Sequence, residues 1–149
     1  MPNISGLRSP HDKVGRLVYF GRMLDKIRLH AAGKLPPEYV ENLGETNPRV
    51  FDARCCRFLG VRHTDLVARV QRGGSDEEIL AWAHEHGTPR DDEECEIWNG
   101  YMSKLGWRDA VAERVRLRVA ESGLDPTNVH TMFDYLDADE GRPAGHLCG

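Results

Sequence analysis

The sequence predicts an all-α protein, a single compact and non-repeating bundle of about six or seven short helices. Apolar residues recur at i, i+3, i+4 and i+7 through most of the chain, which is the spacing of one helix face. Glycines and prolines divide these patterns at short intervals and mark the loops between helices. One alternating segment, Val115–Val119, resembles a strand, but the chain offers no evident partner strand, so a helix is preferred there.

The most hydrophobic long segment is Val14–Gly33, and we expect a largely buried helix over it. Asp12 lies near its start and Gly33 follows its end, the usual polarity of helix punctuation. One face of this helix carries Phe20, Met23, Leu24, Ile27 and Ala31.

Six further helices are expected at 50–59, 63 or 64 to 71, 76–87, 88–105, 107–122 and 126–136. Ser75 and Glu78 have the spacing of a capping box, and Thr88–Pro89 opens the helix that follows. Residues 34–39 are expected to form a rigid linker, because two prolines interrupt a helix there. The whole chain, 1–149, is expected to be one domain with loose ends at about 1–10 and 138–149.

Composition narrows the classes of function. The chain has 149 residues, 40% of them hydrophobic and 30% charged, with a net charge of -4. This balance is typical of a folded soluble domain and argues against a general nucleic-acid or membrane-surface binder. No run approaches the roughly 18 apolar residues of a membrane span, and the first ten residues do not resemble a secretory signal. The four cysteines contain no C-x-x-C motif, so we expect reduced thiols and a cytoplasmic protein.

A charged cluster lies on the long apolar helix. Arg22, Asp25 and Arg28 follow at steps of three, with Lys26 one turn beyond Arg22, so Asp25 is expected between two guanidiniums. Charges on a buried helix must be well paired or must face a cleft. In one interpretation the arginines bind a carboxylate or phosphate, with Tyr19, Tyr39 or His30 adding a hydrogen bond. In the other, the cluster is a structural network of ion pairs.

The last helix offers acids for such a network. Asp134, Asp137, Asp139 and Glu140 gather near its C-terminal end. Acids there face the negative end of the helix dipole and need a cation nearby. The obvious candidates are Arg22, Lys26 and Arg28, and also Arg114 and Arg118, and we expect the last helix to contact the first.

Other chemistry has weaker support. No spacing indicates a metal site, and no cofactor is expected. Arg54 and Arg57 flank Cys55 and Cys56, so a thiol of lowered pKa and an inert buried thiol are both open. The helix after Gly74 is too acidic for a DNA-recognition helix.

Several motifs together resemble those of a bacterial family of small proteins, the domain of unknown function DUF5069. They are Leu7–Pro10, Gly21–Arg28, Gly33–Leu35, Phe58–Val61, Gly74–Trp82 and Phe133–Glu140. The most specific is Arg22–Arg28. The resemblance implies a single helical domain and supports the placing of the charged cluster, but it implies no reaction.

Two hypotheses follow. In the first, this cytoplasmic helical protein binds a small anionic ligand at Arg22, Asp25, Lys26, Arg28 and Tyr39. In the second, it is a non-catalytic module for protein–protein contact or homodimerisation, and the charged cluster only holds the fold together. The sequence does not decide whether the protein is an enzyme.

Overall fold

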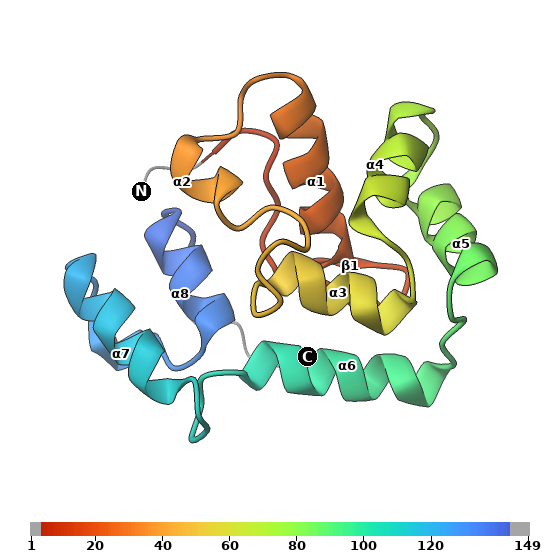
Figure 1. Cartoon of the computed structure of the whole chain (residues 1–149). Coiled ribbons are helices and arrows are strands. Elements are labelled where there is room, and N and C mark those ends of the chain that lie inside the picture. Colours follow the sequence, from red (N-terminus) through yellow and green to blue (C-terminus); the bar gives the residue numbers. More distant parts are fainter. Residues whose placement is uncertain (1–3, 144–149) are drawn as a thin grey trace.

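The computed structural model describes residues 4–143 and is mainly helical, which confirms the predicted all-α class (Figure 1). A hairpin of two very short strands precedes the first helix. The elements are β1 (Lys13–Val14), β2 (Leu17–Val18), α1 (Phe20–Ala31), α2 (Pro37–Val40), α3 (Phe51–Leu59), α4 (His63–Gln71), α5 (Asp76–His86), α6 (Asp92–Lys104), α7 (Ala112–Glu121), the 3-10 helix η1 (Pro126–Asn128) and α8 (Met132–Asp139).

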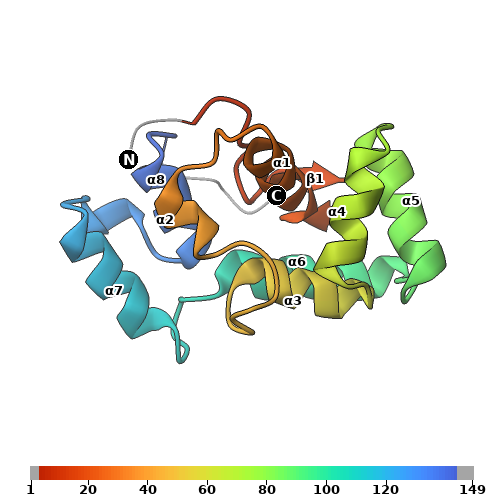
Figure 2. The same cartoon turned by 45° about the horizontal axis from the view of Figure 1, so that its top comes forward.

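The helices surround α1. Figures 1 and 2 show α3 and α6 along one side of it, α4 and α5 at one end of the molecule, and α7 and α8 at the other. The main core gathers around α1, where Phe20, Met23 and Leu24 are fully buried. A smaller core joins α7 to α8 through Val115, Val119, Val129 and Tyr135. No helix within residues 4–143 has the length and apolar character that crossing a bilayer requires.

The helix predicted from Val14 begins instead at Phe20, so this boundary was wrong. Residues 13–18 form the β1–β2 hairpin, in which Val14 pairs with Leu17. The carboxamide of Asn99 on α6 accepts from the Val18 amide at 3.0 Å and donates to the Arg16 carbonyl at 2.6 Å. Because these partners lie about eighty residues away in sequence, local periodicity could not reveal the hairpin.

Two helices also begin later than predicted. The α6 helix starts at Asp92 rather than Thr88, because the Thr88 amide donates to the Leu59 carbonyl at 2.8 Å outside any helix. The α7 helix starts at Ala112, because the Asp109 carboxylate accepts from the Gly106 and Val111 amides and holds residues 106–111 as a loop.

The segment predicted as one final helix divides into η1 and α8, since Thr131 caps a new helix by accepting from the Asp134 amide. The linker predicted at 34–39 contains the start of α2, with Pro37 in its first turn. By contrast, the Ser75–Glu78 capping box is confirmed, and Val115–Val119 is helical as preferred.

Both expected loose ends are partly packed. Leu7 and Ser9 are each 5% exposed and Glu140 is 1% exposed. The Ser9 hydroxyl donates to Asp137 at 2.9 Å, so the start and the end of the described chain lie against each other. Residues 1–3 and 144–149 of those predicted ends lie outside the described residues.

Candidate functional site

The charged cluster predicted on α1 divides among three separate groups of ion pairs. Arg22, Asp25 and Lys26 are buried, whereas the side chain of Arg28 is 40% exposed. Each of these residues pairs with a residue from a different part of the chain, and Asp25 does not pair with Arg22. The predicted charges therefore share one helix, but only Asp25 and Arg28 belong to the same group of ion pairs.

The first group joins α1 to the end of α8. Arg22 donates to both carboxylate oxygens of Glu140, at 2.8 and 2.6 Å, and the Tyr39 hydroxyl donates to the same carboxylate at 2.8 Å. Arg142 adds a further hydrogen bond to Glu140. Burial disfavours the charged form of Glu140, yet these partners hold its pKa below the ordinary value. The predicted contact between the last and first helices is confirmed here.

The acids of α8 itself find other partners. Asp137 lies 3.2 Å from Arg142 and accepts from Ser9. Asp134 lies 3.7 Å from the imidazole of His11. The expectation that Arg22, Lys26 or Arg28 compensates the last helix thus holds for Glu140 and is wrong for Asp134 and Asp137, because the N-terminal segment comes between them and α1.

The second group lies in the main core around Asp52, whose side chain is fully buried on α3. Lys26 donates to Asp52 at 3.0 Å and to the Asn42 carbonyl at 2.7 Å. The Tyr19 hydroxyl donates to Asp52 at 2.6 Å, and the Gly44 amide donates at 2.9 Å. Burial lowers the pKa of Lys26, although the charge of Asp52 opposes that shift.

His63 borders this second group. Its Nε2 atom lies 4.0 Å from Asp52 and has no hydrogen-bond partner in the described part of the chain. Burial lowers the pKa of His63, so the ring is held in its neutral form more strongly than a solvated histidine.

Sequence reasoning missed Asp52. Acids are common in the first turn of a helix, so the sequence around Asp52 does not indicate a special role. Only the burial of Asp52 next to Lys26 distinguishes it from other such acids.

The third group is half-open to solvent. Arg8 binds Asp25 at 2.8 Å and Asp76 at 2.8 Å, and Arg28 binds Asp76 at 2.7 Å and Asp25 at 3.7 Å. Asp25 does lie between two guanidiniums, but Arg8 takes the place predicted for Arg22. Two arginines face two aspartates, so this group carries no net charge that would attract an anion.

The described cysteine thiols are not activated as nucleophiles. Cys55 and Cys56 are buried and free, and burial raises the pKa of both thiols. Arg57 opposes the shift at Cys56 without reversing it. Cys95 is also free and buried, while Cys148 lies outside the described residues. Within residues 4–143, no three His, Cys, Asp or Glu side chains are placed to hold a metal ion.

An apolar cavity of about 540 Å³ opens beside α7 and is lined by Trp107, Val115, Val119, Leu124 and Val129, among others. Trp107, at the edge of this cavity, is 51% exposed.

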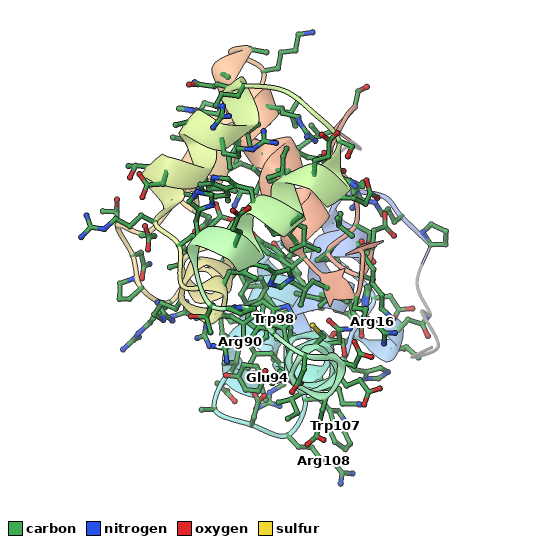
Figure 3. The ribbon with its side chains drawn as sticks, turned by 90° about the vertical axis from the view of Figure 1, so that its right-hand side faces the viewer. Arg16, Arg90, Glu94, Trp98, Trp107 and Arg108 are labelled. Atoms are coloured by element: carbon green, nitrogen blue, oxygen red, sulfur yellow. The ribbon has the colours of Figure 1, made fainter. Side chains whose placement is uncertain are left out.

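Next to this tryptophan, the guanidinium of Arg108 lies 5.0 Å from the centre of its ring. Arg108 has a φ of 54°, which is uncommon outside glycine and costs conformational energy. Figure 3 shows Trp98 on the inner side of α6, whereas Trp107 and Arg108 lie beyond its outer side.

The fold and these contacts define a small helical protein whose buried charges are paired within its own chain. The model of one family, "Domain of unknown function (DUF5069)", matches residues 4–142, and the chain belongs to this family. The match confirms the resemblance drawn from the motifs. No curated protein matches the chain.

Proposed function

We propose that this protein is a non-catalytic interaction module and that it associates with a second copy of itself. The observation that carries the proposal is the half-exposed Trp107, with Arg108 over its ring, at the edge of an apolar cavity. Tryptophan and arginine dominate the binding energy of protein interfaces. A large exposed aromatic beside an open apolar cavity is an unusual feature for a surface that contacts only water.

The pairing of the charges on α1 favours a structural role for the charged cluster that the sequence predicted there. The side chain of Arg22 is 3% exposed and that of Lys26 is 4% exposed, and each already has a buried acid as its partner. A ligand anion would have to displace Glu140 or Asp52 from positions that solvent does not reach. The cost of uncovering such a carboxylate favours the structural interpretation.

Two neighbouring surfaces suggest self-association. On α6, Ile97 is 63% exposed and Tyr101 is 52% exposed, and Glu93 and Glu96 are exposed beside them. On α7, Leu117 is 58% exposed between two exposed arginines, Arg114 and Arg118. An acidic apolar surface and a basic apolar surface complement each other. A two-fold dimer can therefore set α6 of each copy against α7 of the other.

Sedimentation velocity over a range of protein concentrations tests this proposal. We expect the wild type to form a dimer that weakens at high salt, and Leu117→Asp to remain a monomer with an unchanged melting temperature. Val40→Asp, which also places an acid on a partly exposed apolar side chain, is the matched control and should still form a dimer. A wild type that sediments as a monomer at millimolar concentration contradicts self-association.

Anion binding at Arg22, Asp25, Lys26, Arg28 and Tyr39 stays a prediction. The accessible part of that set is Arg28, where an anion would compete with Asp76. A thermal-shift screen with phosphates and carboxylates tests it, since a ligand at a hundred times its Kd adds about 2.7 kcal/mol of stability. Stabilisation that disappears in Arg28→Ala would support this second hypothesis.

We also propose that the protein works in the cytoplasm. The free buried thiols of Cys55, Cys56 and Cys95 support this location, because reducing compartments keep cysteines unpaired. Cell fractionation of the tagged full chain tests the location directly.

A further inference from the structure

A second cavity, of about 470 Å³, lies between α4 and α5. Figures 1 and 2 place these helices at the opposite end of the molecule from α7, so this groove is separate from the α7 part of the proposed interaction surface. Three arginines and one acid line it, together with an aromatic pair. Its charged lining residues are Arg62, Asp65, Arg69 and Arg72.

The arginines converge because of helix geometry. Asp65, Arg69 and Arg72 are spaced at i, i+4 and i+7 and share one face of α4, and Arg62 immediately precedes that helix. Arg69 donates to the Gly73 carbonyl at 2.6 Å, which fixes its guanidinium at the end of the helix. The side chains of Arg62 and Arg72 have no hydrogen bond or ion pair within residues 4–143.

This arrangement differs from the cluster on α1. There each arginine or lysine faces an acid, whereas the lining of this groove holds three cations and one aspartate, Asp65. Arg69 also lies near Glu78 and lowers the pKa of that carboxyl, so Arg62 and Arg72 are the cations that lack an acidic partner in the described part of the chain. The chain as a whole is acidic, with a net charge of -4, so the excess of cations in the groove is local. A groove with uncompensated guanidiniums attracts and orients anions.

The α5 side of the groove is aromatic. Trp82 and His86 are one helical turn apart, and their rings stack with centroids 5.1 Å apart and planes 26° apart. The His86 Nδ1 atom lies 3.0 Å from the Trp82 carbonyl, which fixes the position of the imidazole. Trp82 also packs against the main core. The aromatic wall is therefore in place before any ligand arrives.

We propose that this groove binds a phosphate ester of a flat aromatic ring, the chemical class of the nucleoside monophosphates. Guanidiniums bind phosphate through paired hydrogen bonds, and aromatic side chains stack on planar rings. The volume lies within the range of small-molecule sites. Inorganic phosphate alone would not stack on the rings of Trp82 and His86. An uncharged aromatic ring alone would leave the arginines without an anionic partner.

Isothermal titration of the full chain with adenosine monophosphate, adenosine and inorganic phosphate tests the proposal. We expect the monophosphate to bind about tenfold more tightly than either fragment. The variant Arg62→Glu/Arg72→Glu should weaken that binding about a hundredfold, because two charge-assisted contacts become repulsive.

The matched control is Lys34→Glu/Arg49→Glu, which makes the same change in net charge at exposed positions outside the groove. It should bind the monophosphate as the wild type does. If the glutamate variant fails to fold, Arg62→Gln/Arg72→Gln replaces it with the same expected direction of change.

Equal affinity for the monophosphate in the groove and control variants would overturn the proposal. So would monophosphate binding no tighter than that of inorganic phosphate. A single-stranded oligonucleotide that bound more tightly than the monophosphate would also overturn it, because the ligand would then be nucleic acid rather than a small molecule.

Discussion

Arg22 and Glu140 form a two-pronged ion pair across 118 residues of sequence, with nitrogen–oxygen distances of 2.8 and 2.6 Å. Their side chains are 3% and 1% exposed. The pair links the central helix α1 to the end of α8 and so ties the beginning of the fold to its end. Losing one member of such a pair leaves the other charged and buried, which costs more than the intact pair contributes.

Removing one partner should destabilise the protein strongly. We expect Glu140→Gln and Arg22→Met each to lower the free energy of unfolding by about 3–5 kcal/mol. The double variant Arg22→Met/Glu140→Gln should lose less than the sum of the two single changes, because the two residues contact each other directly and the second change removes an interaction that the first has already lost. Urea unfolding measures all three.

The surface pair Arg116–Glu113 provides the control, since both side chains are more than two-thirds exposed. Glu113→Gln should cost less than about 1 kcal/mol. Single losses at Arg22 or Glu140 as small as this control would contradict the structural role of the buried pair.

His63 should make the protein less stable in mild acid. Because burial lowers its pKa, the native state binds fewer protons than the unfolded chain between that lowered value and about 6.5. Stability therefore falls as the pH drops through this window. The variant His63→Gln should reduce the loss of Tm between about pH 6.5 and pH 5. The exposed His130→Gln is the control, and an equal reduction in both variants would refute the assignment to His63.

The described thiols should be inert in the native protein. Burial raises the pKa of Cys55, Cys56 and Cys95, so little thiolate forms near neutral pH. In a Cys148→Ser background, Ellman's reagent should react slowly with native protein and fully once guanidinium is added. Rapid reaction of any native thiol, at the rate of free cysteine, would show an accessible nucleophile instead.

The two capping boxes should each stabilise their helix measurably. Ser75 accepts from the Glu78 amide at 3.1 Å, and Asp91 accepts from the Glu94 amide at 2.8 Å. Ser75→Ala and Asp91→Ala should each cost about 1 kcal/mol in chemical denaturation. Ser103→Ala, in the last turn of α6, should change stability much less. A cost at Ser103 equal to that at the caps would argue against the capping contribution.

Local patterns identified most of the helices. The helices α3, α4 and α5 fall close to their predicted ranges because apolar spacing acts within a few residues, and the start of α5 is also fixed by its capping box. The same local rules misplaced the start of α1. Its hairpin depends on Asn99 and on Trp98, whose indole donates to the Val18 carbonyl at 3.1 Å, and both belong to α6.

The sequence predicted less well which charged residues form ion pairs with each other. Sequence spacing correctly marked Arg22, Asp25 and Lys26 as charges on a buried helix face. Helix geometry relates residues three or four apart, so it correctly placed Arg28 beside Asp25 but wrongly placed Arg22 there. The acids at the end of the last helix separately indicated Glu140 as a partner for Arg22, whereas nothing in the sequence indicated Asp52 for Lys26. The actual partners of Arg22 and Lys26 are Glu140 and Asp52, which other helices bring to them.

The sequence by itself determined the helical class, most helix positions and the presence of costly charges inside the fold. The tertiary structure decided that these charges are neutralised in three separate groups, that Trp107 lies half-exposed beside a cavity, and that three arginines on and next to α4 line a groove together with Trp82. The physical reason is the distance along the chain over which each kind of interaction acts. Helix formation is governed by neighbours within a turn or two, whereas ion pairing and exposure depend on which distant segments pack together.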